Sequence, residues 1–125
     1  MSRAAAMALV AAVAVAPATQ ARAELGPEAL LGEWCGRWMT LSQYSEYMCL
    51  TIDRVERPVV VGRYETRGTR PERTYTGPFY GTLKGDELSF NLMRLPVTVS
   101  FEGERARGTM RGTKAPKTIE LLRQR

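Results

Sequence analysis

Apolar and polar residues alternate along most of the chain after residue 31, which is the pattern of half-buried β-strands. The clearest runs are Met48–Ile52, Leu88–Leu92 and Val97–Phe101. Turn-forming residues separate such runs, as in the segments 84–86 and 103–105. The pattern therefore predicts short strands joined by short turns.

Eight strands are predicted, and short strands with short links are typical of an antiparallel meander that closes into a barrel. Their ranges are 33–39, 46–55, 59–66, 74–83, 87–93, 97–102, 106–112 and 117–123. Before them, only Pro27–Leu31 is expected to form a helical turn. The predicted fold class is all-β, an eight-stranded antiparallel up-and-down barrel, and a flat sandwich is the alternative.

Glycine recurs two residues before a large side chain, which favours the barrel over the sandwich. The pairs are Gly32 with Trp34, Gly36 with Trp38, Gly62 with Tyr64, Gly81 with Leu83 and Gly108 with Met110. Glycine weakens a strand interior and often marks a bend or a close approach. On an inner face it lets a bulky neighbour lie across it and lets a narrow barrel curve.

Both cysteines and both tryptophans lie on the first two predicted strands. Pairing Cys35 with Cys49 across antiparallel neighbours places Trp34 opposite Leu50, and the even spacing lets both alternations agree. The core face then holds Trp34, Gly36, Trp38, Met48, Leu50 and Ile52, and the solvent face holds Glu33, Cys35, Arg37, Tyr47, Cys49, Thr51 and Asp53. We expect a structural disulfide on the solvent face, and two buried free thiols are the alternative.

The first 23 residues have the features of a cleavable signal peptide. Arg3 precedes an apolar run from residue 4 to residue 16, and residues 21–23 match a small-x-small cleavage site. That run is shorter than the roughly 20 residues that span a bilayer, and no later apolar run is longer. We therefore expect residues 24–125 to form one domain, periplasmic or secreted, without stable membrane insertion.

The net charge of the mature chain is low. Without Arg3 and Arg22, 16 of the 18 basic residues remain against 13 acidic residues, which gives +3. A nucleic-acid-binding domain carries a dense basic stripe, so no nucleic-acid partner is expected. The arginine-rich stretch 63–73 also contains Glu65 and Glu72, and we interpret it as a solvated loop. Contact with anionic lipid headgroups, a cell-wall polymer or an acidic partner is the alternative.

The sequence lacks the residues that most enzymes and metal sites use. It has no histidine, which removes the commonest general base and every metal site that needs one. Neither a phosphate-binding loop nor a G-x-S-x-G motif is present. Asp53, Glu65 and Glu102 fall on predicted outer faces, where water solvates a carboxylate. We therefore expect no catalytic residues, no metal and no cofactor.

Gly32-Glu33-Trp34 on the first strand resembles the G-x-W signature of lipocalin-like (calycin-type) barrels. The last strand, Ile119–Arg123, resembles theirs, which ends near an arginine lying over that tryptophan. The resemblance implies that Trp34 and Arg123 form a barrel-closing cation–π pair, worth about 0.5–2 kcal/mol. Residues 80–110 are similar to the small lipocalin-like domain of exported bacterial proteins, which implies a fold rather than an activity.

The chain is also similar in size to exported bacterial inhibitors of secreted metalloproteases, which have one disulfide and project an N-terminal trunk into the protease. Glu24–Glu28 would be such a trunk here. The cysteine layout departs from that family, whose bridge does not tie the first two strands so tightly. A protein-interaction module acting through its leader is therefore the alternative function.

Five aromatic residues are expected to point inward: Trp34, Trp38, Tyr64, Phe79 and Phe90. They would either line a cavity for a small apolar ligand or fill the barrel, since an eight-stranded barrel does one or the other. A short chain with this much aromatic bulk favours filling. The predicted function is a non-enzymatic exported domain that binds a small apolar ligand or acts as an accessory envelope protein.

Overall fold

All eight predicted strands are present in a computed structural model, which describes residues 26–40, 45–68, 74–111 and 116–125. No strand end differs from its predicted position by more than two residues. The strands are β1 (Gly32–Met39), β2 (Ser45–Glu56), β3 (Val59–Arg67), β4 (Thr74–Lys84), β5 (Glu87–Leu92), β6 (Leu95–Glu102), β7 (Arg105–Arg111) and β8 (Pro116–Arg123). The predicted signal peptide, residues 1–23, lies outside the described residues.

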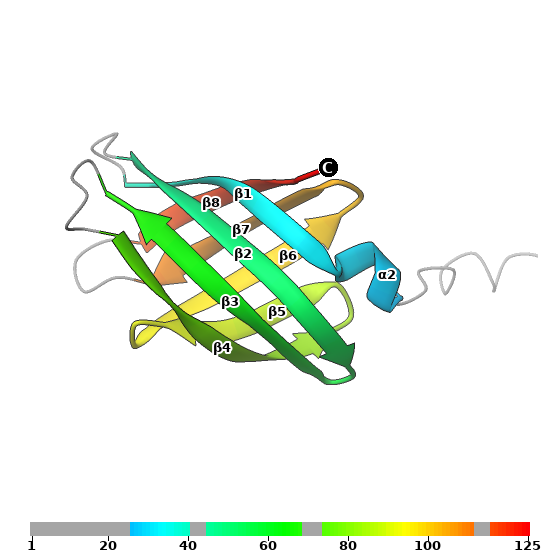
Figure 1. Cartoon of the computed structure of the whole chain (residues 1–125). Helices are drawn as coiled ribbons and strands as arrows, with labels where there is room; N and C mark the ends of the chain where they lie inside the picture. Colours follow the sequence, from blue (N-terminus) through cyan, green and yellow to red (C-terminus); the bar gives the residue numbers. More distant parts are fainter. Residues whose placement is uncertain (1–25, 41–44, 69–73, 112–115) are drawn as a thin grey trace, which may run out of the picture.

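Each strand pairs antiparallel with the next, and β8 returns to pair with β1, so the sheet closes (Figure 1). The predicted up-and-down barrel is confirmed, and the flat sandwich is wrong. The helical turn is also present, as helix α2 (Pro27–Leu30), which lies at one end of the barrel (Figure 1). Within the described ranges, no helix has the length and apolar character needed to cross a membrane.

Alternate residues of each strand point inward and fill the barrel. Near helix α2, the ring of Trp34 meets that of Phe101 edge-on, with 4.9 Å between the ring centres. In the opposite wall, Phe79 stacks on Phe90 at 4.4 Å. Aromatic pairs at such distances add about 0.5–1.5 kcal/mol beyond the burial of their apolar area. The interior is therefore a packed core, as the aromatic content of the sequence indicated.

Three glycines show why the Gly-x-large pattern accompanies a closed sheet. A Cβ atom on Gly36 would collide with the backbone of Glu120, and one on Gly108 would collide with the backbone of Thr98. A Cβ atom on Gly62 would lie 2.7 Å from the ring of Phe79, which occupies that space. Glycine thus lets neighbouring strands approach closely and gives large side chains room across the sheet.

A β-bulge in β2 changes the simple alternation that the sequence predicted. Ile52 pairs with Gly62, but the next pair is Arg54 with Val61, so Asp53 is the extra residue. Asp53 and Arg54 are both exposed, and Val55 turns back toward the core. The bulge lets β2 bend around the narrow barrel while keeping apolar residues inside on both sides of it.

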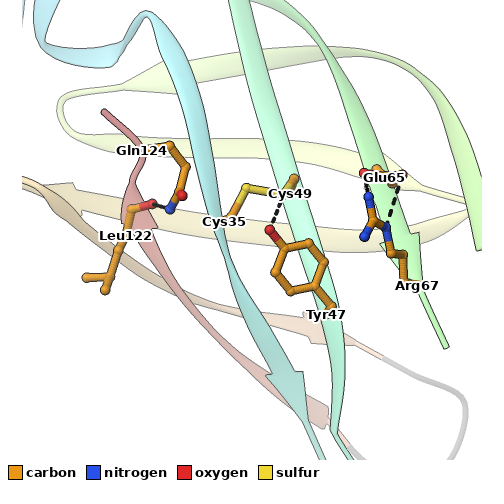
Figure 2. Close-up of a disulfide and its surroundings, with 7 residues drawn as sticks. All are labelled: Cys35, Tyr47, Cys49, Glu65, Arg67, Leu122 and Gln124. Carbon is orange, nitrogen blue, oxygen red and sulfur yellow. Dashed lines mark hydrogen bonds and ion pairs between the residues drawn. A yellow bond between two sulfur atoms is a disulfide. The ribbon is translucent and has the colours of Figure 1, made fainter. Parts of the chain in front are cut away.

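Cys35 and Cys49 form the predicted disulfide between paired positions of β1 and β2, with Cα atoms 4.1 Å apart. The bridge lies on the predicted outer face, outside the core cluster, but Cys35 and Cys49 are only 6% and 5% exposed, so the expectation that solvent reaches it freely is wrong. The hydroxyl of Tyr47 lies 3.1 Å from the Sγ of Cys49 and donates to it (Figure 2). Arg67 lies over the Tyr47 ring at 5.4 Å. These long side chains cover an outer wall that strand alternation alone would leave bare.

We predict that removing the disulfide lowers the free energy of unfolding without changing the fold. The bridge spans 14 residues of sequence, and a loop of this length corresponds to about 3 kcal/mol in the chain-entropy model. Urea unfolding of the oxidised protein and of the Cys35→Ser, Cys49→Ser double variant measures the difference. An equal midpoint for both proteins, with each correctly folded, would contradict the structural role of the bridge.

Candidate functional site

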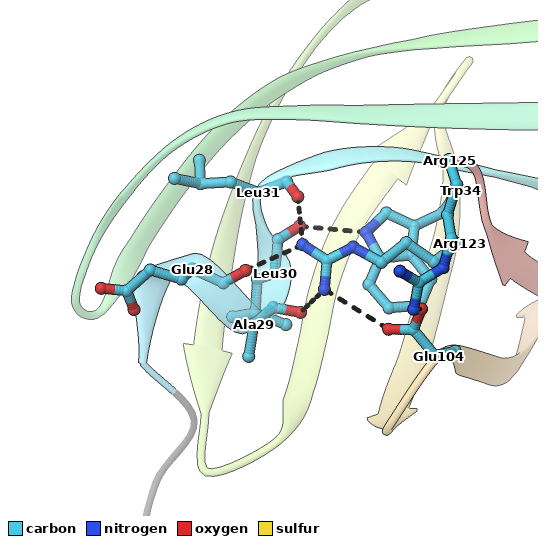
Figure 3. A network of polar contacts seen from close by, with 8 residues as sticks. All are labelled: Glu28, Ala29, Leu30, Leu31, Trp34, Glu104, Arg123 and Arg125. Carbon is cyan, nitrogen blue, oxygen red and sulfur yellow. Dashed lines mark hydrogen bonds and ion pairs between the residues drawn. The ribbon is translucent and has the colours of Figure 1, made fainter.

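Arg123 closes the end of the barrel that carries helix α2 (Figure 3). Its guanidinium donates hydrogen bonds to the backbone carbonyls of Glu28, Ala29 and Leu31, at 2.8, 3.0 and 2.6 Å. It also lies over the Trp34 ring at 5.2 Å, so the pair that the family resemblance implied is in contact. These carbonyls end a short helix and have few partners within it, which makes a cationic donor favourable there.

Trp34 completes the same network from inside the barrel. Its Nε1 donates to the carbonyl of Leu30 at 2.9 Å, and both residues are almost fully buried. On the outside, Glu104 forms ion pairs with Arg123 and Arg125. Helix α2 is thus held from both sides and acts as a plug. Of the predicted inhibitor trunk, Pro27 and Glu28 belong to this plug and Gly26 precedes it. The other two trunk residues, Glu24 and Leu25, lie outside the described residues.

A pocket of about 150 Å³ lies at the end of the barrel opposite helix α2, where β1, β3, β5 and β7 end and the strand after each begins. It is lined mainly by Trp38, Leu92, Leu95 and Met110, with Tyr75 and Met93 at its rim. Lys117 reaches the pocket and places its Nζ 4.2 Å from the centre of the Trp38 ring. The site therefore combines an apolar floor with one cationic group, Lys117, and one carboxylate, Glu46.

Only one of the five aromatic residues predicted to bound a cavity, Trp38, lines this pocket. Trp34 packs at the closed end, and Phe79 and Phe90 stack within the core. Tyr64 also points inward, and its ring lies against Gly77 of the neighbouring strand. Sequence reasoning missed the pocket residues Leu92, Leu95, Met110 and Lys117. The only signal for them was their place at strand ends on the same side of the meander.

Shallow grooves also run along the outer wall on both sides of the disulfide. One, of about 490 Å³, is lined by residues that include Thr51, Arg63 and Glu65. Both nitrogens of the Arg63 fork donate to Asp53 at 3.1 Å, and this hydrogen-bonded carboxylate raises the pKa of Arg63. A second groove, of about 360 Å³, is lined in part by Arg37, Glu120 and Leu122. Both grooves lie open along the wall, and the charged side chains of Arg37, Arg63 and Glu120 at them are exposed.

Glu33, Cys35 and Cys49 place potential ligand atoms within 4.8 Å of one another. The two sulfurs are bonded to each other in the disulfide, so neither is a thiolate that could ligate a metal. One exposed carboxylate remains, which is too few donors for a zinc site. The cluster is explained by the disulfide and its neighbour.

No protein-family model, no curated protein and no solved structure matches this chain. The structure supports an eight-stranded, all-antiparallel closed barrel, and the lipocalin-like assignment stays a resemblance carried by the residues around Trp34 and Arg123.

We predict that Arg123→Met destabilises the protein by about 2–4 kcal/mol, because it removes charged hydrogen bonds and a cation–π contact together. Arg125→Met, two residues away, is the matched control. Its side chain is largely exposed, so its effect should stay within about 0.5 kcal/mol. Urea unfolding followed by tryptophan fluorescence measures both variants. Equal midpoints for the two would show that the plug does not depend on Arg123.

Proposed function

We propose that this protein is an exported, non-enzymatic binding domain that accepts a small apolar group in the pocket at the end of its barrel opposite helix α2. We call this end the open end, because no helix covers it among the described residues. The observation that carries the proposal is the apolar floor of Trp38, Leu92, Leu95 and Met110. Apolar surface gathered in a concavity with few polar groups is the usual character of a ligand site.

The size of the pocket limits what it takes. Sites that bury a drug-sized molecule have about 300–1,000 Å³, roughly two to seven times the 150 Å³ found here. An apolar cavity of about 150 Å³ is large enough for one benzene molecule. The pocket therefore suits a single ring or a short branched chain, and a whole lipid does not fit inside this filled barrel.

Three polar side chains line the pocket, those of Glu46, Thr66 and Lys117, and the last two would orient the bound group. Thr66 is almost fully buried and borders the pocket from β3. Lys117 lies at the rim over Trp38, where it can meet a polar or negatively charged part of a ligand. An apolar floor with few polar groups gives affinity through burial and orientation through the polar contacts.

Two observations support the other two parts of the proposal, which are export and a non-enzymatic role. A disulfide between β1 and β2 is typical of proteins in an oxidising compartment, which agrees with the signal-like N-terminal sequence. The carboxylates of Asp53 and Glu65 bind arginines on the exposed outer wall, and this arrangement is the ordinary one for surface ion pairs.

Toluene is a direct probe of the pocket. We expect titration with toluene to shift the indole N–H resonance of Trp38 in ¹H–¹⁵N spectra and to leave that of Trp34, buried at the closed end, unchanged. Leu95→Phe should fill the pocket and weaken binding at least about tenfold, a change of about 1.4 kcal/mol. Leu122→Phe, on the outer wall, is the matched control and should bind normally. Absence of a Trp38 shift at saturating toluene would refute the proposal.

A further inference from the structure

Strand β4 extends past the end of its neighbour β5. Among the described residues, their ladder has three pairs: Thr82 with Ser89, Leu83 with Leu88, and Lys84 with Glu87. Continuing this register would place Leu92, the last residue of β5, opposite Phe79. The segment Thr74–Gly77 therefore lies beyond β5.

The backbone of this segment directs hydrogen-bonding groups toward the side of β4 where β5 lies farther along the strand. Leu83 donates its N–H to the carbonyl of Pro58 at 2.7 Å, on the β3 side of β4. Successive residues of a strand direct their backbone groups to opposite sides, so the even-numbered residues of β4 face the β5 side. Thr74 and Thr76 thus present N–H and C=O groups there. Pro78, which has no N–H, also falls at an even position, as expected for proline at a free strand edge.

The free edge and the pocket adjoin each other. Tyr75, between the two threonines, lines the pocket and is 49% exposed, and Met93 of the β5–β6 turn lines it and is 43% exposed. Figure 1 shows the start of β4 and this turn at the same end of the barrel. A chain lying along the edge of β4 would cross directly over the pocket.

Charge differs between the two ends of the barrel. We compare the last two residues of each strand at an end, together with the turns described there. The open end has four basic residues and one acidic residue: Arg67, Arg94, Arg111 and Lys117, with Glu46. The closed end has six acidic and four basic residues: Glu33, Glu56, Asp86, Glu87, Glu102 and Glu104, with Arg57, Lys84, Arg105 and Arg123. The open end therefore favours a negatively charged partner.

We propose that the Thr74–Gly77 edge and the adjoining pocket together bind an extended acidic peptide segment. Its main chain adds to β4 as a further strand, and one aromatic or leucine side chain enters the pocket. This inference rests on the proposed function, because it uses the same pocket. Strand addition obtains affinity from main-chain hydrogen bonds and selectivity from pockets for alternate side chains, and both elements are present here.

The register predicts which peptide N–H groups form hydrogen bonds to β4. The side chain of Tyr75 points inward and Gly77 lies on the same inner face, whereas Thr74 and Thr76 direct their backbone groups toward the new strand. A peptide residue whose side chain enters the pocket therefore stands opposite Tyr75 or Gly77, with its own N–H turned away from β4. The two residues flanking it direct their N–H groups to β4.

The probe is acetyl-Asp-Thr-Phe-Thr-Asp-amide, with binding to the full mature chain measured by calorimetry. N-methylation of both peptide threonines should weaken binding at least about tenfold, because two main-chain hydrogen bonds to β4 are lost together. N-methylation of the peptide phenylalanine is the matched control and should leave affinity within about threefold, because that N–H makes no bond to β4. Equal loss in both methylated peptides, or in neither, would overturn strand addition.

Further comparisons test the pocket, the charge and the edge. Replacing the peptide phenylalanine by alanine, or both aspartates by lysine, should each weaken binding at least about tenfold. Thr76→Pro should abolish peptide binding while the Trp38 shift with toluene shows that the barrel is folded.

If toluene binds and the peptide does not, the peptide inference is wrong and the proposed function stands. If neither binds, both are wrong.

Discussion

The pairing of β1 with both of its neighbours is the constraint on which the rest of this barrel depends. Its register with β2 brings Cys35 to Cys49, and its register with β8 brings Trp34 to Arg123. A slip of one residue would turn every inward side chain outward and would separate both pairs. The disulfide opposes a slip on one side of β1. On the other side, the bonds from Arg123 to the helix α2 carbonyls oppose it.

Sealing one end of the barrel gives the two ends different properties. At the sealed end, helix α2 covers the interior and Trp34 and Arg123 hold it in place. The middle is filled by side chains, so no ligand of ordinary size can enter there. At the open end, the strands differ in length, and an apolar pocket remains with basic residues around it. The pockets described in this barrel accordingly lie at the end opposite helix α2 and on the outer wall.

Some features required knowledge of the closed sheet. The bulge in β2 falls where two polar residues, Asp53 and Arg54, separate the inward-facing Ile52 and Val55, and only the pairing with β3 shows that Asp53 is the extra residue. The burial of the disulfide comes from Tyr47 and Arg67 lying over a wall that alternation marks as outer. Likewise, Lys117 and Trp38 lie about 80 residues apart in sequence and meet only because β8 pairs with β1.

The sequence by itself determined the fold class, the eight strands, the cysteine pairing and the glycine positions. Each follows from local alternation, turn residues or even spacing, which act between neighbours along the chain or across one hairpin. The tertiary structure alone decided where the pocket lies and how far, among the described residues, β4 runs past the end of β5. These properties depend on how strands of unequal length end against one another. That geometry is set by closure of the whole sheet, so no single segment records it.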